Sequence, residues 1–544
     1  MTLIRRRTLG ALAALLLAGT IVSPAFAQDT PVQGGTLIYL EQQAHTNLYP
    51  PAGGFYPNGG VLNQITDKLT YQNPQTLEIE PWLAESWEVN DTATEYTFKL
   101  KPGITFSDGT PLDAKAVAVN YDIFGLGNKE LKYPVSEVIN NYDHAEVIDD
   151  LTIKFHFKHP SPGFLQGTSV IGSGIVSVAT LARPYEELGD ATRIIGSGPF
   201  VVESETLGKE LNLKVRADYN WGPGQFEHQG RAWLDGIKYL ITPEDSVRIG
   251  GLLSGQADVI RQIQAYDEPQ VIDAGYEIFA PNTRGVNNSI AFRPDNPLVA
   301  DLKVRQALTL ATNRQEIVDT LFSANYPLAT SVISQHAAGY VDNSAKLVFD
   351  QEKARALFAE AGWTPGADGI LEKDGKRLEL TTYVSLPQPQ NEGVLQLVAQ
   401  QWAQVGVKLN VLAGDAGSRT LDLLDPLKTP VTVAMVGRAD PDVIKSGFHP
   451  KNRDWLLQKG GSSDKVVSFV DDKLNGLLEG LASETVREKR LAIAGEIQGY
   501  VLDQAYVIPF FEEPQAFATA PYVHGLGFEA VGRPSFYNVW LAAH

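Results

Sequence analysis

The sequence predicts an α/β protein built of more than one lobe. Apolar and polar residues alternate in short segments of the first half, which is typical of half-buried strands, whereas helical stripes followed by strands dominate after about residue 287. The 544 residues exceed the ~250 to 300 beyond which a single core stops growing. Because no linker, charge run or fixed repeat divides the chain, we expect lobes formed by a chain that crosses between them.

The first half supplies the predicted strands. Residues 35–40 form a strand, and a loop rich in Pro, Gly, Tyr and Asn follows over 45–60. In residues 96–101 one face is apolar and the other polar, and residues 153–158 alternate in the same way. Asn90-Asp91 and Asp108-Gly109 are typical of tight turns, and Asp113 is placed to cap a helix.

The second half supplies the predicted helices. Asp301, Asn313 and Asp350 each precede an apolar stripe of helical spacing, and Asn313 with Glu316 looks like a capping box. A further helical stripe runs over 394–405 and ends at Gly406, after which residues 407–411 alternate as a strand. This order of elements predicts βα architecture.

Several motifs, taken in order, resemble the bacterial extracellular solute-binding protein family 5, which serves peptide, nickel and opine ABC importers. The motifs are Leu83-Ala84-Glu85-Ser86-Trp87, Tyr96-Thr97-Phe98-Lys99-Leu100, Asp108-Gly109-Thr110-Pro111, Gly196-Ser197-Gly198-Pro199-Phe200, Asp218-Tyr219-Asn220-Trp221, the stretch from Asn296-Pro297-Leu298 to Leu308, and Ala359-Glu360-Ala361-Gly362-Trp363. Ser197 and Asp218 depart slightly from the family pattern. The resemblance covers nearly all of the chain after residue 27.

The resemblance implies a two-lobed periplasmic-binding-protein type II fold with an extra β-rich domain on the first lobe. By this resemblance domain I takes residues 28–64, 186–283 and 506–544. The extra domain takes 65–185, and the second lobe takes 284–505.

The first 27 residues have the three parts of an export signal: Arg5 to Arg7, an apolar stretch, and Ala25-Phe26-Ala27. The export route, general or twin-arginine, stays open. The chain has no cysteine, which rules out disulfides, thiolate metal sites and a lipid-modified cysteine tether. We therefore expect a cleaved signal, no membrane anchor, and a location in the periplasm of a Gram-negative bacterium.

The formal net charge is −19, and loss of three arginines with the signal would make it −22. This excess argues against nucleic acid as a partner. No nucleophile motif or P-loop is present, so we expect no enzyme activity and no cofactor. His156 and His159 favour a structural role, and no metal site is expected.

A binding function needs a cleft with a few aimed polar groups. On the second lobe, residues 436–442 follow an apolar strand, and their Asp-Pro-Asp turn resembles the family turn that meets a peptide's ammonium. Asp440 or Asp442 would bind that cation, although an ordinary Asx-type turn explains the residues equally well. Arg438 would hold a ligand carboxylate or pair with a neighbouring acid. Trp455 is a further aromatic candidate.

On the first lobe, the aromatic and polar loop around residues 45–58 is the candidate cleft wall. Its candidate ligand-binding residues are His45, Tyr49, Tyr56 and Asn58, with surface packing of a long loop as the competing interpretation. The family usually has an acidic or plainer stretch here, which puts a standard dipeptide ligand in doubt.

From the resemblance we expect a monomeric receptor that captures a peptide or peptide-like solute and delivers it to an ABC permease. The alternatives are an opine or metal-chelate ligand on the same fold, a secreted hydrolase or chaperone, and a receptor that feeds a membrane sensor.

Overall fold

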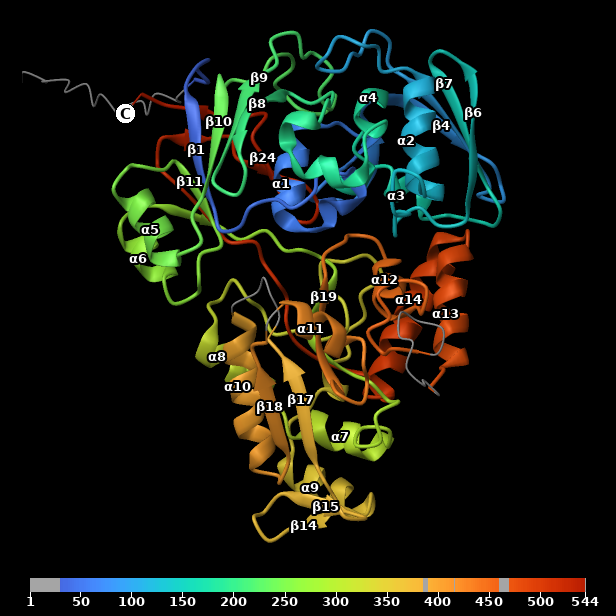
Figure 1. Ribbon diagram of the computed structural model, residues 1–544, viewed down its shortest axis with the longest axis vertical. Coiled ribbons are helices and arrows are strands. Elements are labelled where there is room, and N and C mark those ends of the chain that lie inside the picture. The colour runs from blue at the N-terminus through green and yellow to red at the C-terminus, as the bar shows by residue number, and fades with distance from the viewer. Residues whose placement is uncertain (1–29, 385–389, 415, 459–468, 544) are drawn as a thin grey trace, which may run out of the picture.

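The computed structural model describes residues 30–384, 390–414, 416–458 and 469–543. They form two lobes stacked along the long axis of the molecule (Figure 1), which is the α/β two-lobed architecture that the sequence predicts.

The first lobe is organised by a seven-stranded mixed sheet. β1 lies in its middle and pairs in parallel with both β10 and β11, and the remaining pairs are antiparallel. In sheet order the strands are β12 (Glu277–Phe279), β21 (Phe517–Thr519), β11 (Val259–Arg261), β1 (Thr36–Glu41), β10 (Gly236–Ile241), β9 (Glu210–Val215) and β8 (Phe200–Thr206). Its helices are α1 (Tyr56–Ile65), α5 (Asp245–Leu253) and α6 (Glu268–Asp273), with 3-10 turns η1 (Pro50–Gly54), η3 (Tyr185–Gly189) and η4 (Ala191–Arg193). Two short pairs complete it: β22 (Val523–His524) with β25 (Trp540–Leu541), and β23 (Gly527–Phe528) with β24 (Pro534–Ser535).

The extra domain is a four-stranded antiparallel sheet beside the first lobe. Tyr96, Phe98 and Leu100 of β5 are buried, as their alternation predicts, and Asp113 caps α2 by accepting a hydrogen bond from the Ala116 backbone. One apolar core runs through both the extra domain and the first lobe, so the two pack as one body. The elements of the extra domain are β4 (Ala84–Val89), β5 (Glu95–Leu100), β7 (Thr152–Phe157), β6 (Tyr142–Asp149), the pair β2 (Thr70–Gln72) and β3 (Ile79–Pro81), α2 (Ala114–Leu126), α3 (Phe164–Gly167), α4 (Val178–Leu181) and η2 (Ile171–Ser173).

The second lobe contains two further cores and most of the helices. Its central sheet has the order β19 (Val431–Val436), β13 (Val286–Phe292) and β20 (Val507–Phe511), and its smaller strands are β14 (Thr364–Pro365), β15 (Leu371–Lys373), β16 (Lys376–Arg377) and the parallel pair β17 (Glu379–Tyr383) and β18 (Lys408–Leu412). The helices are α7 (Leu302–Leu310), α8 (Arg314–Leu321), α9 (Gln351–Glu360), α10 (Gln390–Ala403), α11 (Ala416–Leu423), α12 (Val443–Phe448), α13 (Asp472–Ser483) and α14 (Arg487–Asp503), with the turn η5 (Ser344–Lys346). Asp301, Asn313 and Asp350 cap α7, α8 and α9.

Two antiparallel segments connect the lobes. Residues 280–285 lead from β12 to β13, and residues 512–516 lead from β20 back to β21. They bond to each other, because Thr283 N donates to Glu513 O (3.0 Å) and Gln515 N donates to Pro281 O (2.8 Å). Since β20 pairs with β13, the chain returns to the first lobe after Phe511, later than the expected boundary at 506: the apolar run 507–511 completes the second lobe's sheet. The other expected domain boundaries stay predictions.

Among the described residues, no helix combines the length and the apolar character that crossing a bilayer requires.

Candidate ligand-binding cavity

A large cavity lies between the lobes, with a volume of about 1120 Å³. Ligand pockets for small molecules typically measure ~300 to 1,000 Å³, so this cavity has room for more than a single amino acid. Residues from the first lobe, the extra domain, the second lobe and both connecting segments line it. Such a cavity changes shape when the lobes move relative to one another.

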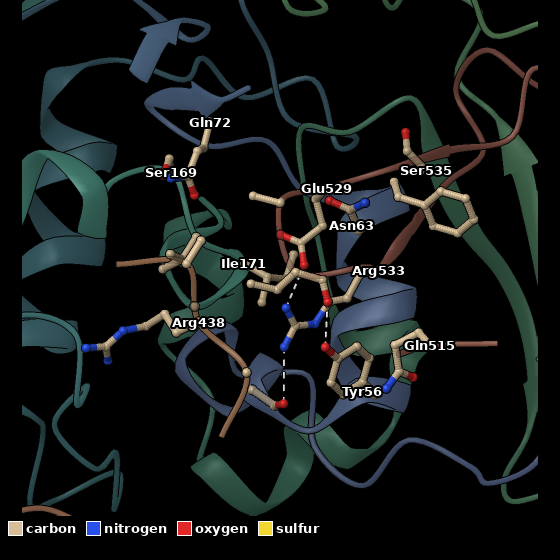
Figure 2. Close-up of a pocket in the computed structure, with 18 of the residues that line it drawn as sticks. Tyr56, Asn63, Gln72, Ser169, Ile171, Arg438, Gln515, Glu529, Arg533 and Ser535 are labelled. Atoms are coloured by element: carbon tan, nitrogen blue, oxygen red, sulfur yellow. Dashed lines mark hydrogen bonds and ion pairs between the residues drawn. The ribbon is translucent and has the colours of Figure 1, made fainter. Parts of the chain in front are cut away.

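The first-lobe wall is built around Arg533. Its guanidinium lies over the ring of Tyr56 (4.6 Å to the centroid), pairs with Glu529 Oε1 (2.6 Å) and donates to the carbonyl of Gly54 (3.1 Å). Figure 2 shows these side chains pointing toward one another, with the Tyr56 hydroxyl donating to the carbonyl of Val531 (2.5 Å). Burial raises the pKa of Tyr56, so its hydroxyl stays a donor at neutral pH. These contacts fix the C-terminal segment to the start of α1.

Aromatic rings cover much of the rest of this wall. Tyr71 packs edge to face against both Trp82 (6.2 Å between centroids) and Phe226 (5.4 Å). Tyr219 and Tyr537 continue the surface, 5.4 Å apart. Rigid aromatic surface of this kind packs against apolar parts of a ligand at a low entropic cost.

The connecting segments contribute Glu513, a buried carboxyl. Its oxygens accept from Asn288 Nδ2 (2.7 Å) and Gln390 Nε2 (3.1 Å). Burial raises the pKa of Glu513 to about 7, although its hydrogen bonds and the charge of Arg261 oppose the shift. Arg261 lies in the cavity wall as well, held by a buried ion pair with Glu41 (Nη2–Oε1 2.6 Å).

The second-lobe wall is the segment after β19. Arg438 makes a two-bond contact with Asp440 (2.5 and 3.2 Å) and donates to Ser446 Oγ (2.9 Å). Burial alone would lower the pKa of Arg438, but the carboxylates of Asp440 and Glu137 outweigh it and raise the pKa. Arg438 is therefore a permanent cation on this wall.

Three of the eight predicted ligand-binding residues lie in the lining: Tyr49, Tyr56 and Arg438. Tyr49 is fully buried, donates to the carbonyl of Pro134 (3.1 Å) and packs against other rings, so it supports the wall from behind. Tyr56 and Arg438 come from opposite lobes. The structure brings these two to the same cavity, and their contact with a ligand stays a prediction.

The other five lie outside the lining, and each has a structural partner. His45 pairs with buried Glu205 (3.1 Å), and Asn58 holds the loop by accepting from Thr46 N (2.7 Å). Asp440 forms an ion pair with Arg438, and Asp442 forms one with Arg490 (2.7 Å). Trp455 packs edge to face on Phe448 (5.4 Å). The structure shows contacts within the fold for these five residues, and their contact with a ligand stays a prediction.

Sequence reasoning missed several charged residues of the lining, namely Lys68, Arg261, Arg284, Glu513, Glu529 and Arg533. They come from segments far apart in the chain, and none sits in a motif that marks a binding site. Within the part of the chain that the structure describes, no group of three or more His, Asp or Glu side chains is arranged to hold a metal ion.

Two hinged lobes around a shared cavity define the class of proteins that capture a ligand between domains. The family model for bacterial extracellular solute-binding proteins, family 5, matches residues 78–443, and the chain belongs to this family. The glutathione-binding protein GsiB of Escherichia coli K12 is 29% identical over 378 residues, covering 68% of each chain.

Solved structures show the same fold. The oligopeptide-binding protein AppA of Bacillus subtilis, in complex with a nonapeptide, has a TM-score of 0.77 at 21% identity and covers 94% of this chain and 100% of its own. NikA of Brucella suis, in complex with Fe(III)-EDTA, has a TM-score of 0.77 at 22% identity, covering 93% and 100%. The predicted family and the predicted fold are both confirmed.

Proposed function

We propose that this protein is the exported receptor of an ABC importer, which captures a peptide or peptide-like solute between its lobes and delivers it unaltered to the membrane permease. The observation that carries the proposal is the cavity of about 1120 Å³ lined by both lobes and by the two connecting segments. Membership of family 5 and the similarity to glutathione- and oligopeptide-binding relatives support the peptide-like class.

Capture and closure are coupled in this proposal. A ligand that contacts Arg438 on one lobe and Tyr56 on the other binds more tightly to the closed arrangement than to the open one. Binding therefore shifts the protein toward the closed arrangement. The hinge is the pair of connecting segments, which are short and bonded to each other. A permease then distinguishes loaded from empty receptor by shape.

The export signal at residues 1–27, the periplasmic location and the monomeric state belong to the same proposal. Retention in the periplasm without an anchor fits a receptor that shuttles to its permease.

The test combines binding, turnover and uptake. Purified protein is titrated with glutathione and with a short-peptide library while its thermal unfolding is followed. Saturable binding of one ligand per chain, with the ligand recovered intact by mass spectrometry, is the expected result. Cleaved or modified ligand would instead indicate a secreted enzyme. Deletion of the gene should abolish uptake of the bound solute, and unimpaired uptake would argue against the importer role.

A further inference from the structure

The cavity is cationic although the whole chain is acidic. Of the described residues that line it, six carry a positive charge and three are carboxylic acids, whereas the full sequence has a net charge of −19. The cations are Lys68, Arg261, Arg284, Arg438, Arg453 and Arg533, and the acids are Glu137, Glu513 and Glu529. A local excess of positive charge in a protein that is otherwise negative indicates that the ligand carries negative charge.

Four of these cations already have a carboxylate partner. Arg261 pairs with Glu41, Arg438 with Asp440, Arg453 with Glu137, and Arg533 with Glu529, all at 2.9 Å or less. These pairs are close to neutral and shape the wall. Lys68 and Arg284 remain, and neither forms an ion pair among the residues that the structure describes.

Arg284 lies at the end of the first connecting segment. Its Nε and Nη1 atoms are buried and have no hydrogen-bond partner among the residues that the structure describes, although the side chain as a whole is partly exposed, and burial lowers the pKa of its guanidinium. Two guanidinium nitrogens that have lost water without gaining an acceptor are costly, because their N–H groups bond neither to solvent nor to a described protein atom. An oxyanion in the cavity would compensate this charge, and the planar fork of arginine suits a carboxylate.

Lys68 lies on the other side of the binding surface, beside the aromatic wall. Its ammonium donates to Asn63 Oδ1 (3.0 Å) and sits 5.0 Å from the ring centroid of Trp82. The side chain is only 3% exposed, and burial lowers its pKa, although Glu529 and Asp67 act in the opposite direction. The single amide oxygen leaves two of the three ammonium protons for another acceptor.

The acidic groups offer little to a ligand cation. Glu137 and Glu529 are occupied by arginines, and Asp440 and Asp442 are paired outside the lining. Glu513 forms no ion pair with the residues that the structure describes, but it already accepts from two amides. In the turn that the resemblance assigned to a peptide's ammonium, Asp440 is therefore neutralised by Arg438 and Asp442 by Arg490.

We infer that the ligand is an anionic, peptide-like solute with at least two carboxylates, one held by Arg284 and another by Lys68. The inference rests on the proposed function and names the ligand class of that same cavity. A ligand held in this way bridges the first-lobe side and the connecting segment, so its charge couples directly to lobe closure.

The test compares acidic probes with counterparts in which two carboxylates are esterified or replaced by amides. Glutathione is paired with its diethyl ester, and the peptide Glu-Ala-Glu with Gln-Ala-Gln, and each is titrated calorimetrically into the full mature chain. We expect the acidic member of at least one pair to bind tenfold or more tightly than its counterpart with two fewer carboxylates, because each charge-assisted contact contributes about one factor of ten. Equal affinity within both pairs, or tighter binding of the members with fewer carboxylates, would overturn the inference.

Variants assign the effect to residues. Arg284→Gln and Lys68→Gln should each reduce the preference for the acidic probe about tenfold, and Arg284→Lys should restore part of it. The measured quantity is the ratio of two affinities, which a general loss of folding does not change. Lys489→Gln, at an exposed position on α14, is the control and should leave the ratio unaltered. An unchanged ratio in both cavity variants would contradict the assignment.

Failure of this inference is separable from failure of the proposed function. If neither acidic probe binds at millimolar concentration, the anionic class is rejected. The gene deletion and uptake assay above then decide independently whether the protein serves an importer.

Discussion

Arg453 of the second lobe forms a two-bond ion pair with Glu137 of the extra domain (2.9 and 3.2 Å), which joins the two lobes across the mouth of the cavity. Burial would raise the pKa of Glu137, but Arg453 and Arg438 outweigh it and hold the pKa below its usual value. The contact exists only when the lobes are close together. It therefore belongs to the closed arrangement.

Replacing Glu137 with Gln should favour the open arrangement. Both side chains are about 35% to 40% exposed, so the pair contributes roughly 0.2 to 1 kcal/mol, or up to about fivefold in ligand affinity. Titration calorimetry should show this loss at low salt and a smaller one at high salt. Lys132→Gln, which removes an exposed pair with Glu186 within one lobe, is the control. An affinity that does not change at any salt concentration would exclude a role in closure.

Gly163→Ala should weaken ligand binding without unfolding the protein. A Cβ at Gly163 would lie 2.3 Å from Asp442 Oδ2 and 3.0 Å from Arg490 Nη2, both on the second lobe. The backbone of Gly163 is right-handed helical (φ −76°), so alanine is tolerated locally. The clash costs ~1 to 3 kcal/mol only when the lobes approach, which predicts a roughly tenfold to hundredfold weaker affinity.

The control for this variant is Gly476→Ala on α13, where a Cβ meets nothing within 4 Å. Thermal unfolding of ligand-free Gly163→Ala should match that of the parent protein within a degree or two, and small-angle scattering should show a larger radius of gyration with ligand present. Normal affinity and normal closure in Gly163→Ala would show that this contact does not form in the bound state.

Glu513 should make stability depend on pH near neutrality. Its pKa in the folded state is about 7, above the ordinary 4.5, so its stabilising contribution is complete below about pH 4.5 and is lost as the pH rises through 7. The charge of Arg261 acts against this shift, and the neutral Tyr56 and Tyr326 also lie near Glu513. Ionisation in this site costs roughly 3 kcal/mol at most.

The measurement is urea unfolding of Glu513→Gln and of the parent at pH 5 and pH 8. The difference in the free energy of unfolding between the parent and the variant, parent minus variant, should decrease as the pH is raised from 5 to 8. The same proton couples to binding: an anionic ligand beside Glu513 favours its neutral form, so affinity should decrease from pH 6 to pH 8 in the parent and less in the variant. A stability difference independent of pH would refute the assigned pKa.

Glu41→Gln should destabilise the first lobe strongly. Glu41 is buried and accepts from Arg261 Nε and Nη2 and from the Tyr39 hydroxyl (3.0 Å). Loss of the carboxylate leaves a buried guanidinium without its counter-charge, which costs ~3 to 5 kcal/mol. Chemical unfolding measures this cost. Glu360→Gln, which removes an exposed pair with Lys303, should cost less than about 1 kcal/mol. Equal effects of the two variants would contradict this interpretation of Glu41.

Local patterns were enough to predict much of the fold. The alternation in β5, the cap of α2 by Asp113 and the caps of α7 to α9 follow from neighbouring residues, and the structure has each of them. The end of the second lobe was placed too early because an apolar run such as Val507–Phe511 carries no sign of which sheet it joins. Only its pairing with β13 decides that.

The cavity was harder to predict because its charges are arranged by long-range contacts. Arg438 and Asp440 are two residues apart and both suit ligand binding, but their mutual ion pair removes the aspartate from the site. Arg533 meets Glu529 through a local turn and Tyr56 through the tertiary fold. Arg284 keeps two buried nitrogens without an acceptor among the described residues, and no sequence pattern reveals this.

The central claim is that the cavity captures an intact, acidic solute. The most direct test is to purify the protein from the compartment to which it is exported and to identify, by mass spectrometry, the small molecules that it releases. The account predicts one solute per chain, peptide-like and carrying at least two carboxylates, in the parent protein and much less of it in Arg284→Gln. Protein that releases no stoichiometric solute, even from cells grown on peptide-rich medium, or a solute that is neutral or cationic, would contradict it.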